Sequence, residues 1–459
     1  MKKFTYILLA GFLFSAVPSC SLLDQTSPNN IDSDLVFTDA NSVENALLGV
    51  YSSMQSRNYL GGHYLMLADG ITDDITTGGY DLFSLDEVND VNPTSGNIYL
   101  SSTYTDIYRT IANVNYLLDG MKTVADLDPD RAKIVEGEAR TIRAMAHFDL
   151  LRYFGYHWDI TSEFGIPIVN RKITFEDIVP RATVAETYDF ITNELEAALS
   201  LVDLEARDAA FVNVSTVHGL LARVYLYKGD KFNASTYATA VIGDGAYSLL
   251  PAEELGNVYA QRRTSESIFE LAFDTRNRSA YNSLTYGRPD AERPELFFMA
   301  DVALGDFFAN RPDDVRASLV NVAPEDNPGM TPDGRTQKYR GEETKDNPAY
   351  ILRLAEMYLI RAECSDAALA LADLNTLREA RGMAALTGEE LDTPEEQLTV
   401  VLDERRAELN FEGHRYFDLA RTQRFVSDLG LDASDAYKAC MPIPVKEINA
   451  TGIAQNPGY

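Results

Sequence analysis

STVHGLLARVYLYKGDKFNASTYATAVI, residues 215–242, carries apolar side chains at helical spacing on both sides of Gly229. A period of three to four residues indicates a helix with one buried face, and glycine favours a break between two helices. The stretch therefore predicts two helices joined at Gly229. The residues that define their faces are Leu221, Ala222, Tyr225 and Leu226, then Phe232, Ala234, Tyr237, Ala238 and Val241.

Small residues where two helices cross, with a glycine turn and an aromatic ring closing the gap, resemble a tetratricopeptide helix pair. Residues 352–381 repeat this pattern, with apolar and small side chains at the same spacing. The two pairs are widely separated, so a strict tandem array is excluded and plain helical hairpins are the alternative. Two pairs of the same type favour a tetratricopeptide-like scaffold.

Proline-free segments extend the helical pattern. Val135, Ala139 and Ile142 begin one apolar face of a long helix expected from about Asp130 to Phe154. The next helix follows Thr183, which has a glutamate three residues later and so predicts a capping box. These segments make the predicted fold class all-α.

Two regions do not follow a helical period. Residues 58–100 are rich in glycine and tyrosine, and residues 273–348 include seven prolines between Pro289 and Pro348. Short strands are plausible at 267–273 and 337–339. Long ordered loops on a rigid scaffold are where binding residues usually lie, so these regions form the predicted loop-rich, ligand-binding half.

The composition excludes several classes of function. The 459 residues hold 40 Lys and Arg against 70 Asp and Glu, a formal net charge of −30. Nucleic acids and anionic membrane surfaces both require a basic face, so general binding to either is not expected. The 45% hydrophobic content excludes disorder as the main state. Three cysteines cannot form a disulfide framework, and Cys364 and Cys440 are expected to be buried free thiols.

The first residues are typical of a bacterial export signal. Lys2 and Lys3 precede an apolar stretch that is too short to span a bilayer. Residues 17–20, Val-Pro-Ser-Cys, resemble a lipobox, although Pro18 is unusual there. We therefore expect residues 1–19 to be a lipoprotein signal peptide and Cys20 to be the lipidated first residue of the mature protein. An ordinary signal peptide is the alternative.

No sequence motif for catalysis or for metal binding is present. The chain has no phosphate loop, no Gly-x-Ser-x-Gly elbow and no His-Glu-x-x-His pair, and its five histidines are not spaced as ligands. The acids of residues 69–90 could hold Ca²⁺, but they lack the alternation of a calcium loop, so a solvated acidic loop is favoured. We predict no cofactor, no metal and no catalytic residue.

Charged residues are concentrated at 403–424. Arg405 and Glu408, Glu412 and Arg415, and Asp418 and Arg421 are each three residues apart, a spacing that can pair charges on one helix face. An active site is one interpretation. We favour an internal ion-pair network that holds two helices together across Gly413.

Four segments, read together, resemble the SusD/RagB family of outer-membrane nutrient-binding lipoproteins of Bacteroidetes. They lie in order after the lipobox and cover nearly the whole mature chain. They are GEARTIRA with FDLLRYFG at 137–155, LRLAEMYLIRAE at 352–363, ERRAEL with GHRYFDLAR at 404–421, and the terminal PIP and QNPGY at 442–459.

This resemblance implies an all-α domain over residues 20–459, with an N-terminal section at about 20–230 and a C-terminal RagB/SusD section at about 265–459. It implies a lipid anchor on the cell surface of the outer membrane, a SusC-like TonB-dependent transporter as partner, and an oligosaccharide, peptide or other nutrient as ligand. It also implies that the protein is not an enzyme. The shared motifs carry over no binding residues.

The site is predicted from chemistry alone. Sugar rings stack on aromatic side chains, and their hydroxyls need a few polar partners. We place the site between the two irregular regions. The predicted aromatic platforms are Tyr80, Phe83, Tyr99, Tyr281 and Tyr286, and the predicted hydrogen-bonding residues are Asp73, Asp74, Asn282 and Arg288.

Other functions remain open. A secreted glycoside hydrolase or lyase on a helical scaffold would release new reducing ends, and a tetratricopeptide adaptor would bind only proteins. The single tryptophan, Trp158, is expected to pack on a helix end. Family members that bind glycans often use tryptophan, so its scarcity makes short oligosaccharides or peptides more credible. A glycan remains the favoured ligand.

Overall fold

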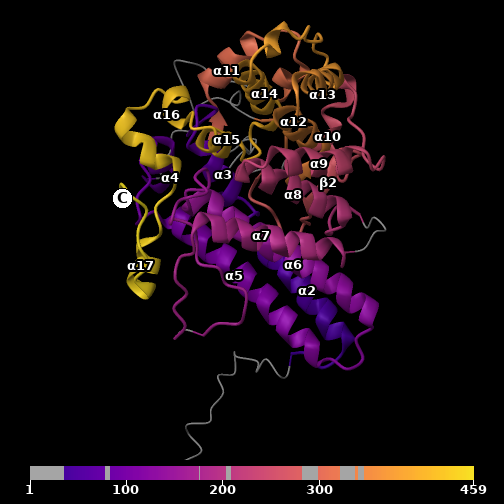
Figure 1. The fold of residues 1–459 in the computed structure, drawn as a ribbon, viewed down its shortest axis with the longest axis vertical. Coiled ribbons are helices and arrows are strands. Elements are labelled where there is room, and N and C mark those ends of the chain that lie inside the picture. Colours follow the sequence, from indigo (N-terminus) through magenta and orange to yellow (C-terminus); the bar gives the residue numbers. More distant parts are fainter. Residues whose placement is uncertain are drawn as a thin grey trace, which may run out of the picture.

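The fold is built mainly from helices (Figure 1). The computed structural model describes residues 36–77, 83–174, 176–202, 208–281, 298–320, 336–339 and 346–459. Its α-helices up to residue 260 are α2 (Ala40–Met54), α3 (His63–Gly70), α4 (Phe83–Asn89), α5 (Ile98–Gly120), α6 (Pro129–Phe154), α7 (Val184–Leu199), α8 (Val214–Lys228), α9 (Lys231–Ile242) and α10 (Asn257–Ala260). Those after residue 260 are α11 (Val302–Ala309), α12 (Leu354–Cys364), α13 (Ala367–Ala380), α14 (Pro394–Leu409), α15 (Arg415–Arg421), α16 (Phe425–Asp428) and α17 (Val445–Thr451).

The remaining elements are short. The 3₁₀ helices are η2 (Met121–Thr123), η3 (Ala252–Glu254), η5 (Val315–Leu319), η7 (Glu389–Leu391) and η8 (Ala433–Ala439). The strands are β1 (Ile75–Thr77), β2 (Ser267–Leu271), β3 (Phe298–Ala300) and β4 (Ala349–Arg353). They form two antiparallel pairs, β1 with β3 and β2 with β4. The predicted all-α class with a few short strands is confirmed.

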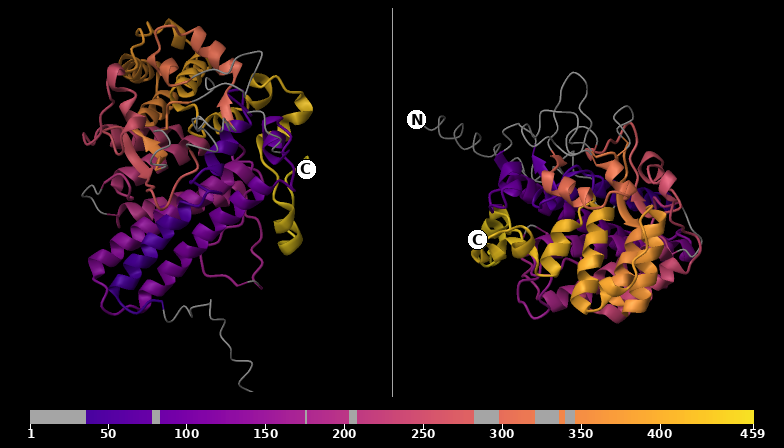
Figure 2. Two further views of the ribbon diagram at one scale, coloured as in Figure 1. Left: turned by 180° about the vertical axis from the view of Figure 1, so that it is seen from behind. Right: turned by 90° about the horizontal axis from the view of Figure 1, so that it is seen from above.

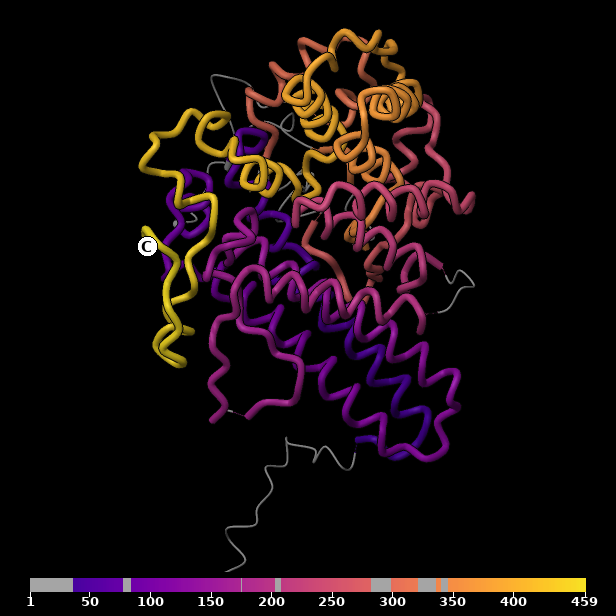
Figure 3. The backbone as a smooth tube through the Cα atoms, in the orientation of Figure 1, coloured from indigo at the N-terminus to yellow at the C-terminus, as the bar shows by residue number. Residues whose placement is uncertain are grey.

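Four long helices, α2, α5, α6 and α7, lie side by side in one half of the molecule (Figures 1 and 3). The longest, α6, begins where Asp128 accepts hydrogen bonds from the backbone N–H groups of Asp130 and Arg131, with Pro129 at its first position. This cap satisfies donors that a helix start otherwise leaves unpaired. The predicted capping box before α7 is also present, between Thr183 and Glu186.

The two predicted helix pairs are confirmed. Gly229 ends α8 with a φ of +81°, a left-handed conformation that glycine adopts without strain. In the second helix Ala238 is buried and Tyr237 stacks on Tyr225, whereas Phe232 is 79% exposed. The second pair is α12 and α13. Because α9 packs against α12, the two pairs stack on each other, as helix pairs do in tetratricopeptide folds.

The irregular regions contain more helix than the sequence predicts. Within residues 58–100 lie α3 and α4, and within 273–348 lies α11. Every residue of α3 is buried, so its sequence has no polar face to produce a helical period. The predicted strand at 267–273 is present as β2, but residues 337–339 form a bend.

The C-terminal segment runs along one side of the molecule (Figure 2), and its residue Asn456 contacts the end of α6. The Asn456 side chain donates hydrogen bonds to the carbonyl oxygens of Phe154, at 3.1 Å, and Met441, at 2.7 Å. Trp158, just beyond α6, stacks on Tyr156 with ring centroids 5.1 Å apart, as expected for a side chain packed at a helix end. The terminal motif therefore has an architectural role.

Most of the charged segment is buried, as the network interpretation predicts, although Asp403 is exposed. Asp418 bonds to Arg421 within α15, and Arg405 of α14 bonds to Asp418 at 2.7 Å across Gly413. Arg405 thus pairs with Asp418 rather than with Glu408. The spacing predicted the existence of the network correctly, but it selected the wrong partners for several of its members.

The centre of the network is a row of three glutamates, Glu404, Glu408 and Glu412. They lie four residues apart in sequence, and each is at most 3% exposed. Their partners come from separate elements, so Glu412 pairs with Arg353 and Lys338 rather than with Arg415. The basic residues that bond to the row are Arg311, Arg316, Lys338, Arg353, Arg378 and Arg381. A buried charge without a partner is costly, so this network holds α14, β4 and η5 in one arrangement.

Buried histidines predict that stability depends on pH. Burial lowers the pKa of His147 to about 3, of His157 to about 3 and of His63 to about 4. The neutral ring of His147 bonds through Nδ1 to the Arg143 carbonyl oxygen, and its Nε2 accepts the Val169 N–H, so a second proton would break that contact. An unfolded histidine takes up its proton near pH 6.5.

The contribution of these histidines to the free energy of unfolding should therefore be fully present above pH 6.5 and should be lost as the pH falls toward 3 to 4. Each such histidine contributes up to about 1.4 kcal/mol per pH unit. Urea titrations at pH 7, 6 and 5 measure this slope. His147→Gln keeps one donor and one acceptor without a titratable ring, so the slope between pH 6 and 5 should decrease by about that amount. An unchanged slope in the variant would refute the assignment.

Candidate functional site

The two irregular regions meet, as the site prediction requires. Strand β1 pairs with β3 in the register Ile75 to Ala300, and the Asp301 N–H donates to the Asp74 carbonyl oxygen at 2.9 Å. Farther along, the Ala280 N–H donates to the Gly61 carbonyl oxygen at 2.8 Å. Segments more than 200 residues apart in sequence thus form one face of the molecule.

The acid pair Asp73 and Asp74 is held by arginines of the charged segment. Arg406 bonds to Asp74 at 2.6 Å and to Asp73 at 2.9 Å, and Arg415 bonds to Asp73 at 3.2 Å. Burial raises the pKa of Asp74, against the opposing effect of Arg406. Asp74 is 1% exposed, so the expected contact with a sugar hydroxyl is not available to it. The side chain of Asp73 is 21% exposed and keeps an open edge.

The predicted aromatic platforms that lie in the described part of the chain differ in exposure. Tyr99 lies in the first turn of α5, partly exposed, with its ring centroid 4.8 Å from that of His63. Tyr281 is completely buried, stacks on Tyr339 at 5.0 Å and donates its hydroxyl to the Leu60 carbonyl oxygen. Its ring is part of the core, so the prediction that Tyr281 is a platform for a sugar ring is wrong.

Of the other predicted site residues, only Phe83 lies in the described part of the chain. Phe83 begins α4. Tyr80, Asn282, Tyr286 and Arg288, together with the predicted lipidation site Cys20, lie outside the described residues. α3 begins at His63 and is a helix of eight residues, therefore about 12 Å long, and Asp73 lies three residues after its last residue, Gly70. Tyr99, whose ring contacts His63, and Asp73 therefore lie toward opposite ends of α3.

Sequence reasoning missed several residues at this face. Phe307 of α11 lies beneath two guanidinium groups, those of Arg406 at 4.9 Å and Arg311 at 5.3 Å from its ring centroid. The sequence did contain one signal for Phe307. Asp301 is a typical N-cap residue and marks the start of α11, which places Phe307 about one and a half turns into that short helix. The partners of Asp73 and Asp74 had no local signal, because Arg406 is more than 300 residues away.

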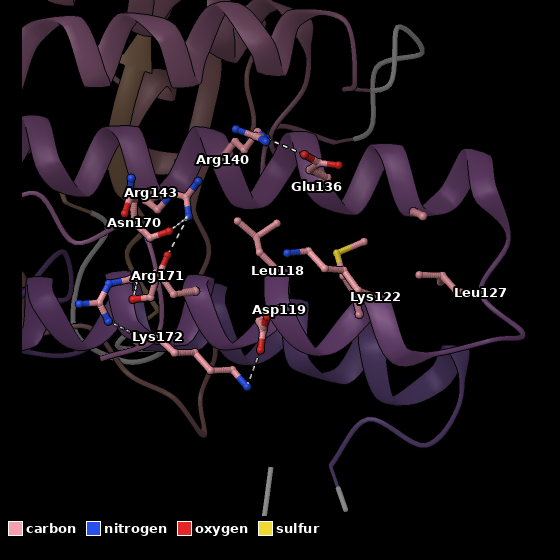
Figure 4. Close-up of a pocket in the computed structure, with 13 residues that line it drawn as sticks. Leu118, Asp119, Lys122, Leu127, Glu136, Arg140, Arg143, Asn170, Arg171 and Lys172 are labelled. Carbon is pink, nitrogen blue, oxygen red and sulfur yellow. Dashed lines mark hydrogen bonds and ion pairs between the residues drawn. The ribbon is translucent and has the colours of Figure 1, made fainter. Parts of the chain in front are cut away.

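A separate hollow lies between α5 and α6. Its volume is about 620 Å³, and the loop at 170–172 closes one side (Figure 4). The residues that line it are Asn115, Leu118, Asp119, Met121, Lys122, Leu127, Ala132, Glu136, Arg140, Arg143, Asn170, Arg171 and Lys172. Arg140 and Arg143 belong to the GEARTIRA motif, but nothing in the sequence predicted the hollow, since its lining comes from three segments that only the fold brings together.

Three further observations bear on the chemistry. Among the described residues, no group of three or more His, Cys, Asp or Glu is arranged to hold a metal ion. Over the same residues, no helix combines the length and apolar character needed to cross a bilayer. Cys364 and Cys440 are free thiols, as expected, and burial raises the pKa of Cys364 to about 12.

Two family profiles match the chain. One, described as "Starch-binding associating with outer membrane", covers residues 22–226, and the other, described as "SusD family", covers residues 329–431. The SusD-like protein P38 of Formosa agariphila is 23% identical over 94% of each chain.

Solved structures agree with these matches. A SusD superfamily protein from Bacteroides thetaiotaomicron is 25% identical, with a TM-score of 0.79 over 92% of this chain and 100% of that one. A SusD superfamily protein from Bacteroides vulgatus is 27% identical, with a TM-score of 0.76 over the same shares. Together with the paired helices and the ordered motifs, these similarities show that the chain belongs to the SusD/RagB family.

Proposed function

We propose that this protein is a non-catalytic, lipid-anchored binding protein of the outer-membrane surface that captures oligosaccharides and delivers them to a SusC-like TonB-dependent transporter. The observation that carries the proposal is the pair of family profiles matched in order along the chain, the first described as starch-binding and associated with the outer membrane. Peptide or another nutrient is the alternative ligand of the same system.

The proposal includes the organisation of the chain. Residues 1–19 would be the signal peptide, Cys20 would carry the lipid, and residues 20–459 would form one domain. The ligand would bind at the face where β1 and β3 pair. Of the predicted contacts, Tyr99 and Asp73 are described residues with exposed edges, and Tyr80, Phe83, Asn282, Tyr286 and Arg288 remain proposed contacts. Tyr281 and Asp74 would support the face from beneath.

The geometry is suited to neutral sugar rings. An aromatic edge at Tyr99 offers an apolar surface, and the open edge of Asp73 accepts hydrogen bonds from hydroxyl groups. Because Arg406 and Arg415 hold Asp73, little conformational freedom is lost when a ligand binds.

Thermal unfolding with soluble glycans and a peptide pool tests the proposal. A ligand that binds only the folded state raises the melting temperature by mass action. We expect a shift with neutral oligosaccharides of one linkage class, and no new reducing ends after long incubation. Tyr99→Ala should weaken that binding about tenfold, the loss of about 1.4 kcal/mol expected for a stacking ring.

Phe232→Ala is the matched control, because Phe232 is a highly exposed aromatic residue on α9 and should leave affinity unchanged. A shift with peptides alone would replace the glycan by a peptide in the proposal. Release of reducing ends would contradict the non-catalytic assignment, and equal losses in both variants would move the site away from Tyr99.

A further inference from the structure

The hollow between α5 and α6 has the size of a ligand pocket. Its volume of about 620 Å³ falls within the range of about 300–1,000 Å³ typical of small-molecule sites. It lies apart from the face where β1 and β3 pair, since the residues that line it come from 115–143 and 170–172. The proposed function does not use it.

The charge of its lining is opposite to that of the chain. Five of the lining residues are Lys or Arg and two are acidic, whereas the whole chain has 40 basic and 70 acidic residues. At physiological ionic strength charges are screened over about 8 Å, so a bound group responds to these near side chains more than to the distant surface. When Glu194 and Asp177, which pair with these cations from outside the lining, are counted as well, the hollow keeps one more basic than acidic side chain.

Some of the cations are fixed in the wall. Arg143 donates to Glu194 at 2.5 Å and to the Asn115 side-chain oxygen at 2.7 Å, and Arg140 bonds to Glu136 and Glu194. Their carboxylate partners hold them in one geometry, so the wall is rigid and its charges are already balanced.

Two cations at the rim are more available. Lys122 has no hydrogen bond or ion pair with any residue in the described ranges, and its side chain extends between α5 and α6 (Figure 4). The side chain of Arg171 is 62% exposed, although it bonds to Asp177 at 2.8 Å. Lys172 is nearby but is paired with Asp119 at 2.7 Å. Lys122 and Arg171 can therefore meet an incoming anion.

Part of the wall is apolar. Leu118, Met121, Leu127 and Ala132 line it beside the charged rim. A surface of aliphatic side chains next to a few fixed polar groups can accommodate a sugar ring, which has apolar faces and polar edges. An inorganic anion would use the cations but not this wall.

We propose that the hollow binds an acidic saccharide, with separate carboxylate or sulfate groups at Lys122 and at Arg171 and a sugar ring against Leu118 and Leu127. The saccharide half of this inference rests on the proposed function, and the anionic half rests on the lining of the hollow. The site is additional to the neutral-sugar face at Tyr99.

Isothermal titration of the full chain tests the proposal with matched probes. The acidic probe is tri-galacturonate, the neutral probe is its methyl ester, and sodium sulfate is the anion without a sugar. We expect tri-galacturonate to bind at least about tenfold more tightly than the ester, as for a ligand that gains charge-assisted hydrogen bonds. The double variant Lys122→Gln with Arg171→Gln should lose about that factor.

Lys133→Gln is the control, because Lys133 lies on α6 with a side chain 60% exposed and paired with Asp130, outside the hollow. Equal affinity for acid and ester, or an acid preference that survives the double variant, would overturn the inference. Sulfate binding as tightly as tri-galacturonate would also overturn it, by showing a site for an anion alone.

The two proposals fail in different ways. Binding of neutral glycans that depends on Tyr99, without binding of tri-galacturonate, would refute the acidic site and leave the proposed function in place. Absence of binding to any saccharide would refute both. Loss of tri-galacturonate binding in the double variant with neutral binding retained is the result expected if both are correct.

Discussion

Glu408→Gln is expected to cost about 3–5 kcal/mol of the free energy of unfolding, the loss typical when one partner of a buried ion pair is removed. Glu408 is 1% exposed and accepts hydrogen bonds from Arg353 at 2.9 Å, from Arg381 at 2.9 Å and from Arg316 at 3.3 Å. Burial acts to raise the pKa of Glu408, but Arg381 and Arg353 outweigh it and hold that pKa well below its usual range.

Glutamine keeps the size of this side chain but removes its charge. Its amide nitrogen would face guanidinium groups that are themselves donors, so buried cations would be left without an acceptor. Since domains have a net stability of about 5–15 kcal/mol, the variant would lose a large part of its stability. Because the network joins α14 to β4 and η5, the loop-rich half should become less stable with it.

Equilibrium urea unfolding of both proteins measures the difference. Glu395→Gln is the matched control, because Glu395 pairs with Arg424 at the surface and its side chain is 76% exposed. Exposed pairs contribute about 0.2–1 kcal/mol, so the control should remain close to the parent protein. Similar losses in the two variants would show that the buried network does not stabilise the fold as argued.

Gly413→Ala is expected to cost about 2–5 kcal/mol, the sum of left-handed backbone strain and overpacking. Gly413 has a φ of +75°, and an added Cβ would lie 2.7 Å from Leu65 Cδ2 and 3.1 Å from Leu65 Cα. Its N–H also donates to the Asp69 carboxylate at 2.9 Å. The turn between α14 and α15 thus packs directly on α3, which supports the proposed ligand face.

Gly430→Ala separates the two contributions. Gly430 has a similar φ of +63°, but an added Cβ would meet nothing within 4 Å. It should therefore cost only the backbone strain, about 1–2 kcal/mol. Urea unfolding of both variants gives the difference between them, which reports the close approach to Leu65. If the two variants were equally stable, the contact between the turn and α3 would not be as tight as described.

Much of the candidate site was beyond prediction from the sequence. The two irregular regions between which it is predicted do pair, through β1 and β3. The individual residues were harder, because a tyrosine in a loop can face solvent, as part of Tyr99 does, or lie in the core, as Tyr281 does. Nothing in the neighbouring residues distinguishes these cases, since burial depends on which distant segment covers the ring.

By itself, the sequence determined the paired helices, their caps and the breaks between them, such as Gly229 and the box at Thr183. These features depend on residues three or four apart, which a helix places together whatever the rest of the chain does. Only the tertiary structure decided that Arg405 pairs with Asp418 and that Asp74 is held by Arg406. It also created the basic hollow between α5 and α6. Ion pairs and cavities form between segments far apart in the sequence, and their geometry exists only once the core has packed.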